Sequence, residues 1–403
     1  MTLVLKGLTM KIFRDPIHNV IDLDMGDGAV NELILRIIDT REFQRLRWIR
    51  QLGFAYVAYP GATHTRFEHS LGAAFVAKKL VDKVLAQEGR LAALYDDAHS
   101  RQLLARFFAR LRGERNTAVI AALLHDIGHG PFSHVFEEIS RGRPHEVWTK
   151  AIILGDSGVR RVLEEYDTRL PRAITDILGG AGDSPAAGII AGQMDVDKID
   201  YLLRDSYMTG AGYGRFDVEW LFNVVTAGLH GGRAQMGLDL GKGLSVAEDF
   251  VMARIYMYRN IYRHKTGLAA ARMLGIIAER TRELAREGVC GLFADARLGR
   301  IMLDTQAPAE QLLHDYTAVS DIDLLAWLKH LHNAEDAVLR QMSRGILERR
   351  LEKDYGPGEY CLSGSAYRDN SGSILLFDKR GVGFTLDEIS KNIPTPGRED
   401  VWD

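Results

Sequence analysis

The stretch LLHDIGHGPFSH, residues 123–134, follows a strongly apolar run and carries four polar side chains that can ionise or bind metal. His125 and Asp126 stand side by side where the apolar run ends, His129 follows one turn later, and His134 comes after a Gly-Pro pair. Such groups are costly to bury unless a partner satisfies them. Imidazole nitrogen and carboxylate oxygen are natural ligands of a divalent ion. The stretch therefore indicates a metal site, although an HD pair taken alone is also common at surface helix ends.

Two further segments favour the metal site. HTRFEHSLG, residues 64–72, places His69 in the first turn of an amphipathic helix, beside Arg66. MDVDKIDYLLRDSY, residues 194–207, sets acids within a helical pattern whose apolar stripe requires burial. Acidic side chains among positions that require burial do not fit a solvent-exposed helix face, so they are candidate functional residues. These acids are Asp195, Asp197, Asp200 and Asp205.

The periodicity along the chain predicts a mostly α fold with a small β element. Apolar spacing predicts helices over 41–52, 67–86, 117–125, 145–154, 194–208, 245–286 and 321–353, with Asn116 as the N-cap of the third. Strand signals are short and occur at Ile12–Phe13, Val20–Leu23 and Ile374–Phe377.

The length of 403 residues exceeds what one core commonly serves. We expect a helical domain over 1–288, which includes an N-terminal regulatory segment over 1–50, and a C-terminal α+β accessory lobe over 289–403 that serves oligomerisation.

The composition is that of an ordinary globular protein, with 46% hydrophobic and 26% charged residues. The 51 Lys and Arg nearly balance 54 Asp and Glu, which argues against a dedicated nucleic-acid binder. Cys290 and Cys361 lack the spacing of a disulfide framework or zinc motif. No apolar run reaches the ~18–20 residues that span a bilayer. We therefore expect a cytoplasmic protein without membrane association.

Six ordered blocks of the chain resemble the deoxynucleoside triphosphate (dNTP) triphosphohydrolases of the HD-domain superfamily, whose animal member joins an HD domain to a sterile alpha motif. The likeness is strong over about residues 11–285 and weak beyond them. The blocks are DPIH (15–18), FQRLRWIRQLG (43–53), TRFEHSLG (65–72), HDIGHGPFSH (125–134), DVDKIDYLLRD (195–205) and YRNIYRHK (258–265).

The resemblance implies attack of water on the α-phosphorus of a dNTP, giving a deoxynucleoside and inorganic triphosphate. The implied ligands of a divalent ion, whether Mn, Mg, Fe, Co or Zn, are His69, His125, Asp126 and Asp197. The implied acid–base groups are His129, Glu137 and His145 at the water, and His134 at the leaving 5′-oxygen. The animal enzyme has Asp where this chain has Glu137, and a solvated helix carboxylate is the alternative interpretation of that residue.

The resemblance also implies the substrate contacts. Phosphate contacts fall on Arg66, Lys198, Tyr201 and Arg254, and sugar contacts on Gln51, Leu52, Asp205 and Tyr262. Tyr258 lies on the same predicted helix stripe as Arg254 and Tyr262, where core packing is an equal alternative. Arg263 stands near the base, where the animal enzyme has Gln, so the base preference does not carry over.

A nucleotide activator, GTP or a dNTP, is implied at a site that bridges subunits of a homo-oligomer (dimer, tetramer or hexamer). Its residues are Lys11, Ile12, Asp39, Gln44 and Arg47. As the alternative, Asp39 with Glu42 is typical of a helix N-cap, and Arg47 of a solvated helix position.

Residues 88–115 interleave arginines with Phe107 and Phe108. Such a stripe can bind single-stranded nucleic acid or a neighbouring subunit, but we favour a solvated helix with a packed Phe face.

Two other functions stay open: another HD phosphohydrolase, acting on a nucleoside monophosphate or other nucleotide, and a non-catalytic nucleotide sensor or nucleic-acid-binding protein on this fold. Housekeeping control of dNTP pools and antiphage defence are both consistent with the favoured activity.

Overall fold

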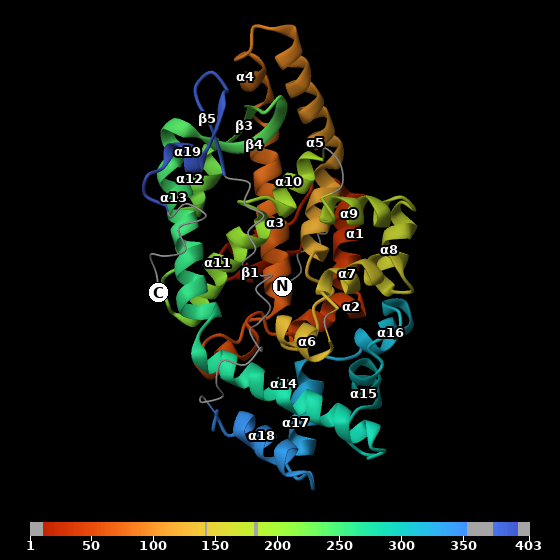
Figure 1. The fold of residues 1–403 in the computed structure, drawn as a ribbon. Coiled ribbons are helices and arrows are strands. Elements are labelled where there is room, and N and C mark those ends of the chain that lie inside the picture. Colours follow the sequence, from red (N-terminus) through yellow and green to blue (C-terminus); the bar gives the residue numbers. More distant parts are fainter. Residues whose placement is uncertain (1–10, 142, 181–183, 353–373, 394–403) are drawn as a thin grey trace.

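A computed structural model describes residues 11–141, 143–180, 184–352 and 374–393. The described part is mostly helical with two small sheets, which confirms the predicted fold class (Figure 1). Two long helices, α3 (Arg66–Leu85) and α5 (Ala98–Leu124), pack against each other at its centre. On its other side α3 packs against α11 (Val196–Thr209), so the three segments singled out in the sequence lie on adjacent helices.

The N-terminal part begins with a short hairpin. Strands β1 (Ile12–Asp15) and β2 (Asn19–Asp22) form at the two predicted strand positions and pair antiparallel, and β2 contacts α3. The chain then forms α1 (Gly28–Ile38), α2 (Arg41–Gln44), and 3₁₀ helices at Arg45–Trp48 (η1) and Gly53–Val57 (η2).

Short helices surround the central pair. They are α4 (Glu88–Ala92), α6 (His134–Ile139), α7 (His145–Leu154), α8 (Gly158–Tyr166), α9 (Leu170–Leu178), α10 (Pro185–Ala191) and α12 (Val218–Val224). Residues 118–124, the last two turns of α5, are buried on every side, and α5 packs against helices α3, α9 and α10.

The larger sheet has the order β3-β4-β5-β6 and combines distant parts of the chain. The hairpin of β3 (Val225–His230) and β4 (Arg233–Asp239) turns at Gly231 and Gly232, both with positive φ. That glycine pair suits a two-residue hairpin loop. Strand β5 (Leu375–Phe377) runs parallel to β4 and antiparallel to β6 (Gly383–Thr385), which leads into α19 (Leu386–Ile389).

The remaining helices occupy the lower end of Figure 1. They are α13 (Leu240–Met257), which descends to it, then α14 (Lys265–Arg286), α15 (Ala296–Leu303), α16 (Ala309–Tyr316), α17 (Asp321–Leu331) and α18 (Ala337–Leu347). The division at residue 288 stays a prediction; α14 ends two residues before it, while β5 and β6 join the sheet formed by residues 225–239.

Several predicted helix limits are wrong. Asn116 is not an N-cap, because α5 begins at Ala98 behind Asp97, which accepts a hydrogen bond from the backbone N–H of Ser100. The predicted helix over 245–286 is interrupted by a π-helical turn, Tyr258–Tyr262 (η3), after which His264 caps α14. Similarly, 41–52 is an α-helical turn followed by a 3₁₀ turn, and 321–353 contains two helices.

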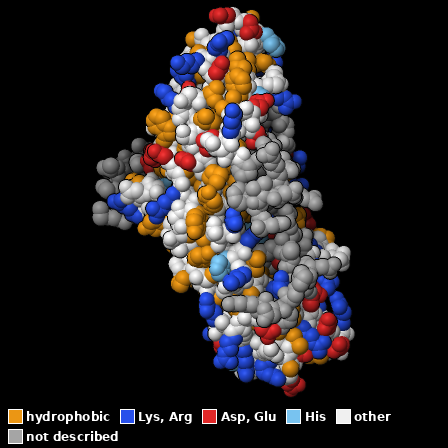
Figure 2. All heavy atoms as spheres, turned by 60° about the vertical axis from the view of Figure 1, so that its left-hand side comes forward, with side chains coloured by type: hydrophobic (Ala, Val, Ile, Leu, Met, Phe, Trp, Pro, Cys, Tyr) orange, Lys and Arg blue, Asp and Glu red, His pale blue; other side chains and the backbone are white. Residues whose placement is uncertain are grey.

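The side of the molecule that carries α13 shows hydrophobic groups scattered among charged ones, and many Lys and Arg near the level of α18 (Figure 2). Among the described residues, no helix combines the length and the apolar character needed to cross a membrane. Cys361 lies outside the described residues, and Cys290 is exposed with a free thiol.

Candidate active site

The four predicted metal ligands converge at the contact of α3, α5 and α11. Their ligand atoms all lie within 4.8 Å of one another. Nε2 of His69 lies 3.0 Å from Oδ1 of Asp197 and 3.4 Å from Oδ2 of Asp126. Nε2 of His125 lies 3.4 Å from both Oδ1 of Asp126 and Oδ1 of Asp197. The side chain of Asp197 is 36% exposed while that of His69 is fully buried, so the cluster is open to solvent on its Asp197 side.

Hydrogen bonds fix how the two imidazoles face this cluster. Nδ1 of His125 lies 2.7 Å from the carbonyl oxygen of Ala122, and Nδ1 of His69 lies 2.8 Å from Oδ2 of Asp200. A carbonyl and a carboxylate only accept, so each Nδ1 carries the donated proton. Both Nε2 atoms therefore present lone pairs to the two carboxylates, which is the donor set that suits a divalent transition metal. The residues present fit a bound divalent ion.

Charges in the cluster favour the protonated imidazoles when no cation is bound. Burial alone lowers the pKa of His69, but hydrogen bonds with Asp126, Asp197 and Asp200 outweigh it and raise that pKa well above its usual value. The pKa of His125 is likewise raised, because Asp126 and Asp197 outweigh burial. Burial would raise the pKa of Asp197, but its hydrogen bonds with the two histidines hold it far below its usual range.

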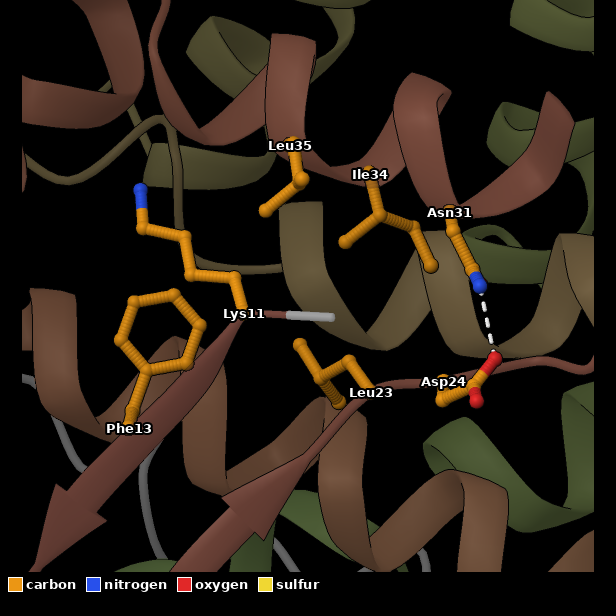
Figure 3. A pocket seen from close by; sticks show the side chains of 7 residues that line it. All are labelled: Lys11, Phe13, Leu23, Asp24, Asn31, Ile34 and Leu35. Carbon is orange, nitrogen blue, oxygen red and sulfur yellow. Dashed lines mark hydrogen bonds between the residues drawn. The ribbon is translucent and has the colours of Figure 1, made fainter. Parts of the chain in front are cut away.

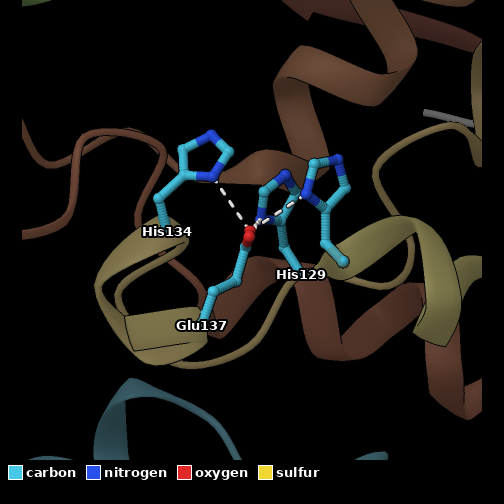
Figure 4. Close-up of side chains that lie close together, drawn as sticks. His129, His134 and Glu137 are labelled. Carbon is cyan, nitrogen blue, oxygen red and sulfur yellow. Dashed lines mark hydrogen bonds and ion pairs between the residues drawn. The ribbon is translucent and has the colours of Figure 1, made fainter. Parts of the chain in front are cut away.

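The four predicted acid–base residues form a second cluster, also with ligand-type atoms within 4.8 Å of one another. Figure 4 shows Glu137 pointing toward the imidazoles. Its Oε1 lies 2.9 Å from Nδ1 of His134 and 3.0 Å from Nδ1 of His145. The rings of His129 and His145 stack with centroids 3.8 Å apart. Nε2 of His129 lies 3.3 Å from Oδ1 of Asp126, so the second cluster adjoins the first.

The environment assigns these residues different protonation states. Burial would raise the pKa of Glu137, but hydrogen bonds from His134 and His145 lower it to about 2, so it is an anion at neutral pH. Burial and the charges of Arg66 and His145 hold the pKa of His129 well below its usual value. His129 is thus neutral, and its buried Nδ1 has no hydrogen-bond partner in the described structure.

The loop that joins the clusters is strained. Phe132 and Ser133 have φ of 55° and 59°, a region that costs a non-glycine residue about 1–3 kcal/mol. Asp321, at the start of α17, accepts hydrogen bonds from the backbone N–H of Phe132 (2.7 Å) and of Arg50 (3.0 Å). The hydroxyl of Tyr316 donates to the carbonyl of Gly128 at 2.7 Å. Residues beyond 288 therefore hold the loop at 128–133, which no motif in the sequence indicated.

All four predicted phosphate contacts lie against other protein groups, Tyr201 through its contact with the ring of Tyr262. Arg66 is buried and bonds to Asp126 and, at 2.8 Å, to the hydroxyl of Ser133. Nζ of Lys198 lies 2.5 Å from Oδ2 of Asp195, and burial raises the pKa of Asp195 to about 6. The guanidinium of Arg254 lies 5.9 Å from the ring centre of Tyr258. Their contact with phosphate stays a prediction.

The predicted sugar contacts come together around Asp205. Oδ2 of Asp205 accepts a hydrogen bond from the hydroxyl of Tyr262 at 2.8 Å, and Oδ1 lies 2.7 Å from Nε2 of His64. The backbone N–H of Gln51 donates to the carbonyl of His64, and the buried Oε1 of Gln51 has no partner in the described part of the chain. Leu52 follows as the residue before η2.

The tyrosines flank this group. The ring centres of Tyr201 and Tyr262 are 6.0 Å apart, and those of Tyr258 and Tyr262 are 5.0 Å apart. Burial raises the pKa of both Tyr201 and Tyr262 well above the usual value, so each stays a phenol. Arg263 ends η3, where its backbone N–H donates to the carbonyl of Tyr258.

Four of the five predicted activator residues lie in two pairs. Nζ of Lys11 is 3.7 Å from Oδ1 of Asp39, and Nε of Arg47 donates to Oε1 of Gln44 at 2.9 Å. Ile12 is 54% exposed. The N-cap interpretation of Asp39 is wrong, because Thr40 caps α2 and Asp39 ends α1.

Lys11 also lines a pocket with Phe13, Leu23, Asp24, Asn31, Ile34 and Leu35 (Figure 3). Its volume is about 20 Å³, which is room for a water molecule and too small for a nucleotide, and Lys11 is the one predicted activator residue that lines it.

The basic segment of α5 matches the solvated-helix interpretation. Phe107 and Phe108 are buried, while Arg110 and Arg112 pair with Glu114 and Glu88. Arg106, Phe107 and Arg110 line one side of a cavity of about 760 Å³ between α5, α10 and β4.

Comparisons with known proteins agree with this site. Residues 66–205 match the model of the HD domain, and this range contains all four predicted ligands. The uncharacterized protein YwfO of Bacillus subtilis is 32% identical over 97% of this chain and 83% of its own length.

Two relatives named deoxynucleoside triphosphate triphosphohydrolase SAMHD1 also match. The Gallus gallus protein is 28% identical over 86% of this chain and 56% of its own length, and the Homo sapiens protein 30% identical over 64% and 42%. This chain thus spans less than two thirds of either. The crystal structure of a phosphohydrolase from Bacteroides thetaiotaomicron superposes with a TM-score of 0.74, at 28% identity, over 95% of both chains.

Proposed function

We propose that this chain, which belongs to the HD-domain phosphohydrolase family, hydrolyses dNTPs to a deoxynucleoside and inorganic triphosphate. One observation carries the proposal: the His69–Asp197 cluster and the His129–Glu137 cluster adjoin each other through Asp126. A metal-binding donor set beside a group of imidazoles is what metal-assisted attack of water on phosphorus requires. The relatives named as dNTP triphosphohydrolases support the substrate class.

A divalent ion held by His69, His125, Asp126 and Asp197 would neutralise phosphate charge and polarise a phosphoryl oxygen. The lone pair on Nδ1 of neutral His129 is available to take a proton from the attacking water. As the water oxygen bonds to the α-phosphorus, the bond from that phosphorus to the 5′-oxygen breaks. His134 donates its proton to the departing oxygen. Its ring is exposed to solvent, and a hydrogen bond between its Nδ1 and Glu137 fixes the orientation of the ring.

Glu137 serves as an anchor in this scheme. As an anion it accepts hydrogen bonds from His134 and His145 on a single oxygen, and this bridging aligns the acid with the stacked rings. The solvated-carboxylate interpretation of Glu137 is therefore not favoured.

Sugar selection belongs to Gln51, Leu52, Asp205 and Tyr262. The unpartnered Oε1 of Gln51 and the carboxylate of Asp205 suit a 3′-hydroxyl, while Leu52 and Tyr262 would exclude a 2′-hydroxyl. We further propose nucleotide activation at Lys11, Ile12, Asp39, Gln44 and Arg47 in a homo-oligomer, for which the exposure of Ile12 and of the Asp39 side chain leaves room.

Product analysis tests the proposal. The purified chain is incubated with Mn²⁺ or Mg²⁺ and each of the four dNTPs, alone, in pairs and with GTP. Deoxynucleoside and intact triphosphate are the expected products, and dependence on a second nucleotide supports the activator site. Monophosphate or pyrophosphate would indicate another HD phosphohydrolase reaction. Absence of turnover in all combinations favours the nucleotide sensor.

A further inference from the structure

A buried carboxylate that the proposed reaction does not use lies directly behind the metal ligand His69. We propose that Asp200 is the positioning residue that orients His69 for the metal, and that His18, delivered by the N-terminal hairpin, holds Asp200 in place. The inference deepens the proposed function, since it rests on His69 being a metal ligand.

Every hydrogen-bond position on the Asp200 carboxylate is filled. Oδ2 lies 2.8 Å from Nδ1 of His69 and accepts from Nε of Arg204 at 2.8 Å. Oδ1 lies 2.7 Å from Nε2 of His18 and accepts from Nη2 of Arg204 at 2.9 Å. The side chain of Asp200 is fully buried. A carboxylate bound at four points cannot rotate, so the His69 ring that donates to it has one orientation.

The DPIH block explains why His18 reaches this place. Oδ1 of Asp15 accepts hydrogen bonds from the backbone N–H of Ile17 and of His18, both at 2.9 Å, which shapes the turn between β1 and β2. Oδ2 of Asp15 accepts from Nη1 of Arg204 at 2.7 Å. The same aspartate therefore forms the turn that presents His18 and anchors the arginine that flanks Asp200.

Helix α3 carries a glycine where it passes the Asp200 carboxylate. Gly72, one turn after His69 in α3, faces the carboxylate so closely that a Cβ atom there would lie 1.9 Å from Oδ1 of Asp200. Only a glycine permits this approach.

Outer carboxylates of this kind fix the tautomer of a ligating histidine and raise its basicity. Loss of such a partner typically costs about 10–100-fold in metal affinity. His18 is the member to test, because it is far from the ligands in sequence and touches neither them nor the acid–base cluster in the contacts described.

The experiment measures Mn²⁺ binding alone, by isothermal titration of the full metal-free chain. His18→Gln places an amide N–H near the position of Nε2, whereas His18→Asn is too short to reach Asp200. His99→Ala, at an exposed position of α5, is the matched control. We expect His18→Asn to weaken Mn²⁺ binding by about 10-fold or more, and His18→Gln and His99→Ala to stay close to wild type.

Equal Mn²⁺ affinities for His18→Asn and His18→Gln would overturn the inference, even if both lower the melting temperature of the metal-free protein, because His18 would then be merely structural. Failure of the proposed function gives different results: a wild type that binds no Mn²⁺, or one that binds it without releasing triphosphate from any dNTP.

Discussion

Nε2 of His69 and Nε2 of His125 face each other at 3.3 Å, while the opposite nitrogen of each ring is committed to an oxygen acceptor. With neither a proton nor a cation between them, two lone pairs at this distance would repel each other. A shared cation would turn that repulsion into attraction, and Oδ1 of Asp197, which lies within 3.4 Å of both nitrogens, would help to hold it. The relationship makes metal binding the first property to test.

Replacing Asp197 by Ala removes one ligand without disturbing a fully buried side chain. We expect Asp197→Ala to lower metal affinity by more than ~100-fold, beyond the loss of an outer partner, and to abolish hydrolysis while the helical circular dichroism stays. Metal content after dialysis and turnover are measured together, with Asp176→Ala, whose side chain on α9 is 47% exposed and pairs only with Arg172 among the ion pairs described, as the control. A variant that keeps both metal and activity would remove Asp197 from the ligand set.

Metal binding should weaken as the pH falls. A proton and the metal compete for the same Nε2 lone pairs, and the pKa values of His69 and His125 are both raised above the usual value of 6.5. Metal binding at neutral pH must therefore displace protons from these imidazoles. The metal affinity then rises with pH by up to about tenfold per pH unit for each proton displaced. Mn²⁺ titrations between pH 6 and 8 (roughly the range over which histidine titrates) check this, and a flat profile would contradict it.

Glu137→Gln keeps the size of the side chain and removes its charge. Because the ionised carboxylate bridges His134 and His145 on one oxygen, we expect turnover to fall by about 10²–10⁴-fold. Metal content should be unchanged, since Glu137 lies outside the ligand cluster. A pKa of about 2 also means that Glu137 does not give rise to the acid limb of the pH–rate profile. An apparent pKa near 4–5 that disappears in the variant would show instead that Glu137 titrates there.

Leu52→Gly tests the sugar gate. Removing the side chain should relax the exclusion of a 2′-hydroxyl, so kcat/KM for an rNTP should rise relative to the matching dNTP by about tenfold. Leu52→Met keeps the volume and should preserve the ratio. Unchanged selectivity in Leu52→Gly would argue against the gate.

Two helix-interior glycines should respond to alanine with opposite signs. At Gly72 the new methyl meets Oδ1 of Asp200 at 1.9 Å and Nη2 of Arg204 at 2.6 Å, so Gly72→Ala should destabilise by about 1–3 kcal/mol. At Gly113 in α5 nothing lies within 4 Å, and Gly113→Ala should stabilise by up to ~1 kcal/mol. Urea unfolding of the metal-free proteins measures the free energy of unfolding of both variants. Equal changes in the two would show that the Asp200 carboxylate can move away from the new methyl group at little cost.

The candidate metal ligands and the fold class could be predicted from the sequence, but the limits of several helices and one hairpin could not. The candidate metal ligands could be chosen from the sequence because each lies in a short motif on an amphipathic or buried helix, and those motifs form α3, the end of α5 and α11. Helix limits were less predictable: a solvated helix with a packed Phe face was favoured for 88–115 and a buried helix was predicted from Asn116, but no local signal showed that the two join as the single helix α5. The hairpin β3–β4 was missed although its turn at Gly231 and Gly232 is a local signal, whereas the parallel pairing of β4 with β5, far along the chain, has no local signal.

The residues that support the candidate site from behind were the hardest to predict from the sequence. Asp321 and Tyr316 act on the loop at 128–133 through contacts that span more than 180 positions, and no local pattern reports such a contact. His18 and Asp200 each stand in a recognised block, but only the fold brings the two within 2.7 Å.

The most direct measurement is hydrolysis of a dNTP in ¹⁸O-labelled water with Mn²⁺, followed by mass spectrometry of both products. Water attack at the α-phosphorus predicts equal amounts of deoxynucleoside and triphosphate, with one ¹⁸O atom in the triphosphate and none in the nucleoside. Label in the nucleoside, or release of pyrophosphate or monophosphate, would contradict the central claim.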